Sequence, residues 1–145
     1  MRINGTFGRA ALAGTGFALG VAVTVAMGQG AYPPLDVLLS SSETVLGQPF
    51  AYPDGTPVIT AAIVTLQPGE STGVHRHEAP LFALILEGEL TVDYGADGTR
   101  VYVADDALIE AFGTPHAGTN TGPGPVRILA VFAGSDAVRN TVMEE

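Results

Sequence analysis

Residues 69–90 read GESTGVHRHEAPLFALILEGEL, and this stretch decides which fold the chain adopts. His75 and His77 are separated by one residue in a strand-like segment, so both imidazoles project from the same face. The apolar run Leu81–Glu87 follows, and a single glycine separates it from another run that begins at Glu89. Short runs of this kind predict consecutive β-strands.

The same pattern continues on both sides of this stretch. Short runs rich in Val, Ile, Thr and aromatic residues alternate with turns that contain Gly and Pro, and no long helical period lies between them. We expect strands at residues 44–50, 58–67, 73–77, 81–87, 89–94, 99–103, 107–111, 116–121 and 127–133. Many short strands without an internal repeat predict one all-β domain, either a β-sandwich or a closed jelly roll.

The N-terminal segment has the pattern of an export signal. Arg2 and Arg9 precede an uncharged, mostly apolar stretch at residues 10–27, and small residues flank Met27. We therefore expect a signal peptide at residues 1–28 and a periplasmic or secreted protein. The alternative is an uncleaved membrane anchor through residues 10–27.

The 145-residue length leaves room for one domain with a short appendage. After the signal segment, a stretch with two adjacent prolines and three consecutive serines has the composition of a connector. We expect a connector at residues 29–42, a β-barrel at 43–136 and a C-terminal tail at 137–145.

The charge composition excludes several classes of partner and chemistry. All six positive residues are Arg, and fifteen acidic residues give a net charge of -9. A nucleic-acid partner is not expected because no basic stripe could displace counterions from phosphates. An anionic membrane surface would repel the chain. Because cysteine is absent, disulfides, Cys-based metal sites and thiol nucleophiles are excluded.

The chain contains three histidines. His116 opens another predicted strand after a Gly-Thr-Pro turn, and it would lie beside His75 and His77 if the sheet curls closed. Three neutral imidazoles on adjoining strands suit Zn, Fe, Mn, Ni or Cu. The alternative is a surface His-x-His pair with an unrelated turn histidine, and the spacing alone leaves both interpretations open.

At these residues the sequence resembles the cupin superfamily. The first cupin motif runs Gly, five residues, His-x-His, three or four residues, Glu, six residues, Gly. Gly69, His75, His77 and Gly88 match it. The resemblance covers roughly residues 44–134.

The second cupin motif contains Gly, two residues, His, three residues, Asn, which Gly113, His116 and Asn120 match. Asp105 replaces the opening Gly of this motif and Ala111 its Pro, which weakens the local turn geometry. The resemblance implies a cupin-type double-stranded β-helix, or jelly-roll barrel, that dimerises frequently. It also implies one divalent metal inside the barrel, with His75, His77 and His116 as its ligands.

The usual carboxylate ligand of the first motif is missing. Leu81 occupies its position, so the resemblance implies a three-His site with an aliphatic wall if Leu81, Ala83 and Ile85 face inward. Glu78 and Glu110 are the candidates for a replacement carboxylate, and strand alternation turns Glu78 outward.

The resemblance implies two functions that the sequence leaves open. In the first, the protein is an exported metalloprotein and a dioxygenase-like oxidoreductase acting on a small molecule. In the second, it is a non-catalytic cupin that binds metal or ligand, as a sensor or accessory module does. A homodimer is also expected, because the resemblance implies a family whose members frequently dimerise. We expect metal affinity to fall between about pH 7 and 5 as the imidazoles protonate, and the acidic surface to raise the histidine pKa values.

Overall fold

Nine strands and one short 3-10 helix follow one another in the computed structural model, which describes residues 34–145. The strands are β1 (Pro57–Leu66), β2 (His75–Arg76), β3 (Leu81–Glu87), β4 (Glu89–Asp93), β5 (Thr99–Val103), β6 (Ala107–Ile109), β7 (Ala117–Asn120), β8 (Val126–Ser135) and β9 (Val142–Met143). The helix η1 (Gly95–Asp97) connects β4 to β5. The predicted signal or anchor segment lies outside the described residues. Among residues 34–145, no helix is long and apolar enough to cross a membrane.

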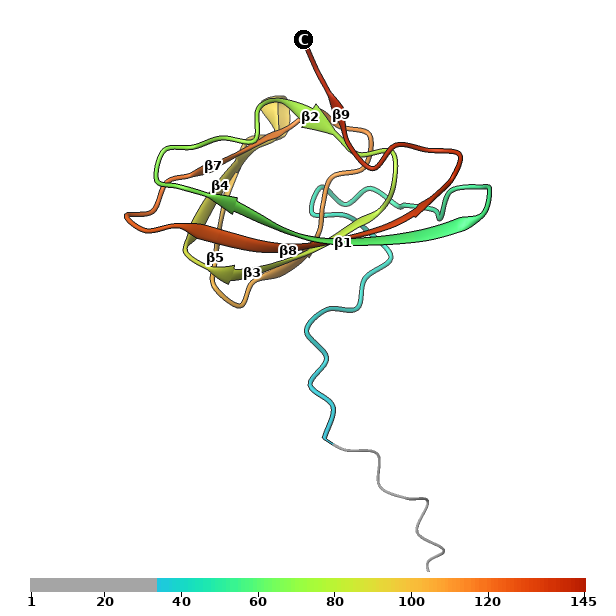
Figure 1. Cartoon of the computed structure of the whole chain (residues 1–145), viewed down its shortest axis with the longest axis horizontal. Helices are drawn as coiled ribbons and strands as arrows, with labels where there is room; N and C mark the ends of the chain where they lie inside the picture. Colours follow the sequence, from blue (N-terminus) through green and yellow to red (C-terminus); the bar gives the residue numbers. More distant parts are fainter. Residues whose placement is uncertain (1–33) are drawn as a thin grey trace, which may run out of the picture. The chain divides into compact units, whose positions relative to one another are not determined.

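The strands form three antiparallel sheets that curve around a common interior. The largest has the order β1-β8-β3-β6, the second has the order β5-β4-β7, and β2 pairs with β9. In Figure 1 the sheet that contains β1, β8 and β3 forms one wall, and β4 and β7 lie across the interior from it. The predicted all-β jelly-roll fold is confirmed.

Strand alternation determines which side chains enter the barrel. Leu81, Ala83 and Ile85 of β3 are buried, as are Leu90 and Val92 of β4 from the opposite sheet. The condition for an aliphatic wall, that these three residues of β3 face inward, is therefore met. The other face of β3 is less well covered, and its residue Leu86 is 40% exposed. A homodimer that covers this face stays a prediction.

Most predicted strands are present, but the one at residues 44–50 is wrong. This segment is a tight turn closed by a single bridge between Glu43 and Pro49. The Thr44 hydroxyl accepts hydrogen bonds from the backbone N–H groups of Leu46 and Gln48, at 3.2 and 3.3 Å. Such local side-chain bonds compete with a strand ladder.

The Asp105 substitution in the second motif has a direct structural counterpart. Asp105 has a φ of 73° and is the one non-glycine residue with positive φ in the described part of the chain. This left-handed conformation suits the glycine that the motif usually carries, because a Cβ there crowds the backbone.

We expect Asp105→Gly to raise the free energy of unfolding by about 0.5–1 kcal/mol because it relieves this crowding. Urea unfolding measures the change. Asp106→Gly is the matched control, since the Asp106 carboxylate accepts a hydrogen bond from the Val103 N–H at 2.8 Å. That variant should lose stability, and a loss in Asp105→Gly as well would contradict the prediction.

Candidate metal centre

Backbone hydrogen bonds bring the two histidine-containing segments together. The N–H of His75 donates to the His116 carbonyl at 2.9 Å, and the N–H of His116 donates to the His75 carbonyl at 2.8 Å. Two residues further on, the His77 carbonyl accepts the N–H of Gly113 at 3.0 Å. The turn that precedes His116 is therefore fixed against the His-x-His segment.

The three imidazoles converge inside the barrel. Their residues are 3–8% exposed, and one ring nitrogen of each lies within 4.8 Å of the others. The ring centroids of His75 and His116 are 4.5 Å apart, and His77 lies 4.9 and 5.1 Å from these two rings. The prediction that His116 joins the pair is confirmed, and the interpretation as a surface pair with an unrelated turn histidine is wrong.

Backbone carbonyls select the same tautomer in all three rings. Each Nδ1 lies 2.9 Å from a carbonyl oxygen, which can only accept a hydrogen bond, so each Nδ1 carries the proton. The carbonyls belong to Gly73 for His75, Asn140 for His77 and Thr114 for His116. Each Nε2 is left with a free lone pair, which is the usual arrangement of imidazoles that bind a metal.

Burial keeps two of these imidazoles neutral. It lowers the pKa of His75, although the bond to the Gly73 carbonyl opposes this effect. Burial is also the main cause that lowers the pKa of His77 to about 4, with a smaller contribution from the other two rings. The expectation that the acidic surface raises the histidine pKa values is wrong for these two residues. The neutral form, which binds metals, predominates at pH 7.

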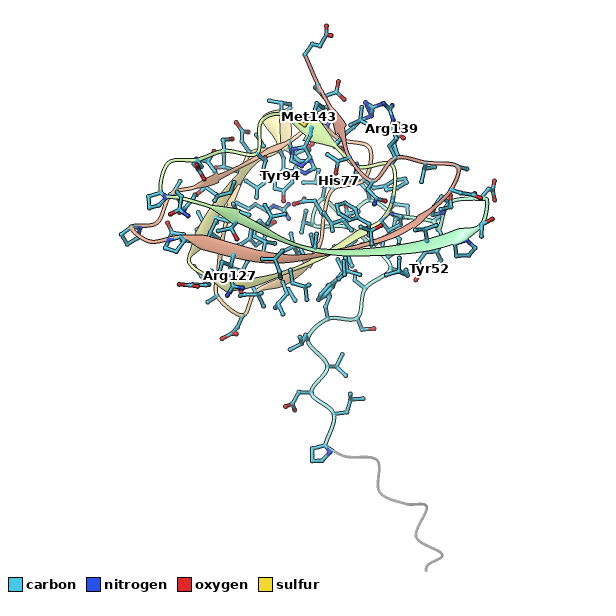
Figure 2. All side chains as sticks on the ribbon, in the orientation of Figure 1. Tyr52, His77, Tyr94, Arg127, Arg139 and Met143 are labelled. Carbon is cyan, nitrogen blue, oxygen red and sulfur yellow. The ribbon has the colours of Figure 1, made fainter. Side chains whose placement is uncertain are left out.

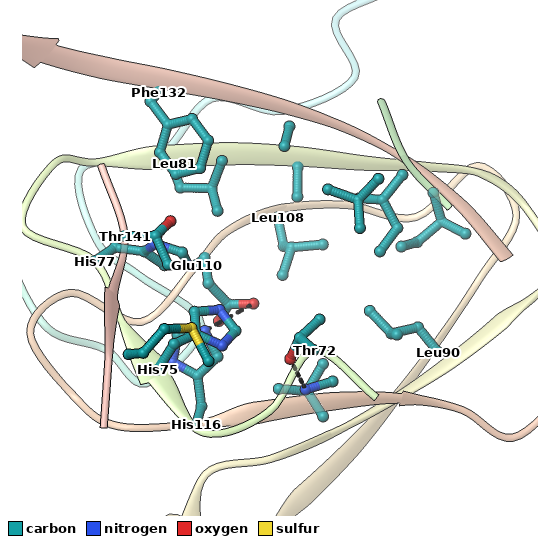
Figure 3. Close-up of a pocket in the computed structure, with 18 residues that line it drawn as sticks. Thr72, His75, His77, Leu81, Leu90, Leu108, Glu110, His116, Phe132 and Thr141 are labelled. Atoms are coloured by element: carbon teal, nitrogen blue, oxygen red, sulfur yellow. Dashed lines mark hydrogen bonds and ion pairs between the residues drawn. The ribbon is translucent and has the colours of Figure 1, made fainter. Parts of the chain in front are cut away.

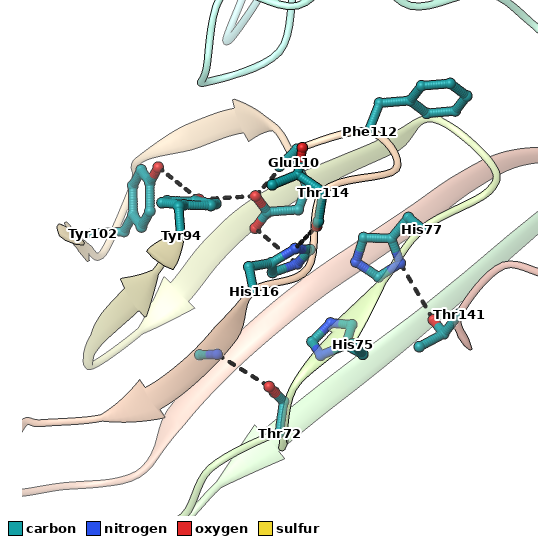
Figure 4. Close-up of polar contacts among 12 residues, drawn as sticks. Thr72, His75, His77, Tyr94, Tyr102, Glu110, Phe112, Thr114, His116 and Thr141 are labelled. Atoms are coloured by element: carbon teal, nitrogen blue, oxygen red, sulfur yellow. Dashed lines mark hydrogen bonds and ion pairs between the residues drawn. The ribbon is translucent and has the colours of Figure 1, made fainter. Parts of the chain in front are cut away.

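Glu110 is the carboxylate that the fold brings to the histidines. Its Oε1 accepts hydrogen bonds from the Tyr94 hydroxyl at 2.8 Å and from the N–H of Ala111 at 2.7 Å. Its Oε2 lies 3.9 Å from Nε2 of His116 (Figure 4). Burial, together with the nearby Glu110, raises the pKa of Tyr94, so this hydroxyl stays protonated and donates.

The other candidate, Glu78, faces away from the histidines. It pairs with Arg76 and Arg139, each at 3.4 Å. The outward orientation predicted from strand alternation is therefore correct. Glu110 reaches the interior because its N–H donates to the Leu81 carbonyl at 2.9 Å, directly across from the position where the motif usually has its carboxylate.

The histidines line one end of a cavity of about 210 Å³ (Figure 3). Leu81, Ala83 and Ile85 contribute to its wall, as the sequence predicts. Thr141 and Met143 also line it, and they come from the segment that was expected to be a tail outside the barrel. No motif in the sequence marks these two residues.

The family model of the cupin domain matches residues 62–132. This range begins within β1, ends within β8 and includes all three histidines. The chain carries a cupin domain. Comparison with curated proteins finds no match.

Solved structures with the same fold agree with this assignment. An uncharacterized conserved protein with a double-stranded β-helix domain from Klebsiella pneumoniae is 20% identical, with a TM-score of 0.52 over 66% of this chain and 85% of that one. Oxalate decarboxylase from Lactobacillus farciminis, in a formate complex, is 26% identical, with a TM-score of 0.51 over 59% of this chain. An oxalate oxidase is 22% identical, with a TM-score of 0.51 over 59% of this chain. The cupin domain spans 26% of the decarboxylase and 45% of the oxidase.

The C-terminal segment orients a histidine of the cupin domain. The Asn140 carbonyl holds Nδ1 of His77, and β9 pairs with β2 through His75 and Met143. We expect a chain that ends at Val138 to bind divalent metal about 10–100-fold more weakly, because partners that orient a ligand contribute on that scale.

Calorimetric titration with zinc measures this loss. The matched control ends at Met143, which removes the partly exposed ion pair between Arg76 and Glu144 and the hydrogen bond from the Glu144 N–H to the Val74 carbonyl, but keeps Asn140 and β9. This control should bind zinc within about threefold of the full chain, since such ion pairs contribute little. Equal affinity in both truncated chains would contradict the role of the C-terminal segment.

Proposed function

We propose that this cupin domain binds one divalent metal through the Nε2 atoms of His75, His77 and His116, and that it uses the metal for chemistry on a small molecule inside the barrel. The proposed class is a dioxygenase-like oxidoreductase. The proposal rests on one observation: the acceptor atoms of the three histidines and of Glu110 lie close together, and no hydrogen-bond donor of the described residues lies between them.

Four acceptor atoms face one another at this site. Three are the Nε2 atoms, whose rings carry the proton on Nδ1, and the fourth is Oε2 of Glu110. No residue in the described range 34–145 forms a hydrogen bond to any of the three Nε2 atoms. Lone pairs that face one another without a donor between them repel, and a divalent cation relieves this repulsion.

The donor set fits several metals. Three imidazole nitrogens suit Fe, Zn, Mn, Ni or Cu, and an adjacent carboxylate oxygen is compatible with all of them. A bound metal would supply a Lewis acid and, if it is redox active, a route for electron transfer. Glu110 also places a negative charge beside a site that three neutral rings would leave at about +2.

The residues of the barrel contribute three further properties. The Tyr94 hydroxyl and the Ala111 N–H hold one oxygen of Glu110, so the other oxygen points toward His116. The aliphatic wall of β3 gives this side of the cavity a low polarity, which strengthens electrostatic interactions beside it. The cavity offers a small molecule room beside the histidines.

Oxygen consumption tests the proposed reaction class. The protein would be loaded with Fe(II) under anaerobic conditions and then mixed with oxygenated buffer that contains an enol or a phenol. The iron-loaded protein should consume oxygen, whereas the zinc-loaded protein should not. Binding of such compounds without any oxygen uptake by the iron form would instead favour the non-catalytic, sensor-like cupin. The similarity to an oxalate decarboxylase supports an enzyme over a simple binder.

We also propose that the protein is exported, since Arg2 and Arg9 precede an uncharged apolar run that ends near small residues. Intact-mass measurement of the native protein should give a chain that begins near Gln29. A full-length chain in the soluble cytoplasm would contradict export, and a full-length chain in the membrane would favour the uncleaved anchor.

A further inference from the structure

The cavity of the barrel has one polar end and one apolar end. The three histidines, Glu110 and Thr141 lie together at the polar end (Figure 3). Leu90 lies away from them, and the remaining wall is mainly aliphatic. The aliphatic lining consists of Val64, Leu81, Ala83, Ile85, Leu90, Val92, Leu108, Ile128 and Ala130.

No arginine of residues 34–145 reaches this cavity. The chain has no lysine, and none of the lining residues is an arginine. Figure 2 shows Arg127 and Arg139 at the periphery of the barrel, whereas His77 and Tyr94 lie inside it. The four arginines of the described part lie elsewhere: Arg76 and Arg139 pair with Glu78, Arg100 donates to the Val45 carbonyl, and Arg127 is exposed beside Glu87.

The neutral polar groups of the lining are also largely occupied. The Thr72 hydroxyl donates to the Gly73 carbonyl at 2.9 Å and accepts the N–H of Gly118 at 3.0 Å. The Thr141 hydroxyl lies 3.3 Å from Nδ1 of His77. A charged group placed beyond the histidines would therefore be buried without a partner, which is strongly unfavourable.

The size of the cavity limits the molecule further. Its volume of about 210 Å³ exceeds the ~150 Å³ of an engineered cavity that binds benzene, so one ring with a small substituent fits. Ala83 and Ala130 are paired neighbours on the adjacent strands β3 and β8, and both line the cavity. Their short side chains leave this space open.

We infer that the cavity accepts a neutral, apolar molecule of about one ring that carries oxygen donors at one end only, such as a phenol, catechol or enol. The inference rests on the proposed function, because the metal anchors the oxygen donors. Small dicarboxylates are disfavoured, since their outer oxygens would contact aliphatic carbon. The cavity is therefore a poor fit for oxalate, the compound in the names of the similar oxalate decarboxylase and oxalate oxidase.

Binding to the zinc-loaded protein tests the inference without any turnover. Titration calorimetry would compare 4-methylcatechol with 3,4-dihydroxybenzoate, which has the same donor pair but a carboxylate in place of the methyl group, and with oxalate. We expect 4-methylcatechol to bind at least about tenfold more tightly than either anion, because only the anions bury an unpaired charge. Equal or tighter binding of an anion, or no binding of 4-methylcatechol, would overturn the inference.

Two variants test whether 4-methylcatechol binds inside the cavity. Ala130→Leu fills the cavity and should weaken 4-methylcatechol binding about tenfold or more while zinc still binds. Ala133→Leu lies on the same strand but does not line the cavity, and it should bind like the parent protein. Equal ligand affinity in both variants would overturn the inference.

The metal is measured first in these experiments, so two failures are distinguishable. A parent protein that binds no zinc would contradict the proposed function. A parent protein that binds zinc but prefers the anions would overturn only the inferred ligand class.

Discussion

Each of the variants His75→Ala, His77→Ala and His116→Ala is expected to lose stoichiometric metal binding. Every ring supplies one of three nitrogens that lie within 4.8 Å of one another, and Glu110 is the carboxylate beside them. Loss of a partner that only orients a ligand already costs 10–100-fold in affinity, so loss of a ligand should exceed roughly 100-fold.

Metal content after dialysis against a chelator measures this effect. Phe132→Leu is the matched control, because Phe132 lines the cavity 5.4 Å from the His77 ring and has no metal-binding atom. This control should retain one metal per chain, and circular dichroism would verify that all the variants are folded. Retention of the metal by all three histidine variants would show that the ligands are assigned wrongly.

The second large effect concerns the metal-free protein at acidic pH. In the folded state burial lowers the pKa of His77 from 6.5 to about 4, and the pKa of His75 shifts in the same direction. Between these pH values the unfolded chain binds more protons than the folded one, so stability falls as the pH decreases from about 6.5 to 4. The shift at His77 alone corresponds to a loss on the order of 3 kcal/mol.

Urea unfolding of the metal-free protein at several pH values measures this loss. His77→Gln removes the titrating ring while its amide can still donate to the Asn140 carbonyl that the ring contacts. Its stability should therefore depend less steeply on pH in this range. A parent protein that is equally stable at pH 7 and pH 4.5 would mean that the histidines are not buried as neutral groups.

The clustering of the histidines could be predicted from the sequence because it depends on local rules. Two residues that are separated by one position lie on the same face of a strand, and this places His75 and His77 together. The glycine turn before His116 and the closure of an all-β domain bring the third ring to them. The inward parity of Leu81 and Ala83 follows from the same alternation.

The identity of the nearby carboxylate could not be predicted with the same certainty. Glu110 lies at the site because of the register between β3 and β6, where Phe82 is opposite Ile109. Register between strands that are distant in sequence depends on the packing of the whole sheet. A shift of one residue would have turned Glu110 outward.

The role of the C-terminal segment was missed for a different reason. β9 has two residues, so it has no detectable alternation, and its contribution to His77 comes from a backbone carbonyl of Asn140. A carbonyl is present at every position and leaves no signature in a sequence. The turn at residues 44–50 was missed because the Thr44 side chain bonds to the local backbone in a segment with strand-like composition.

Metal content is the most direct test of the proposed site. The protein would be purified without a metal-binding tag, incubated with Zn(II), passed through a desalting column and analysed by mass spectrometry for metals. We expect one zinc per chain for the parent protein and none for the variant in which His75, His77 and His116 are all replaced by Ala. A parent protein without zinc, or a triple variant that retains it, would contradict a metal site formed by the three histidines.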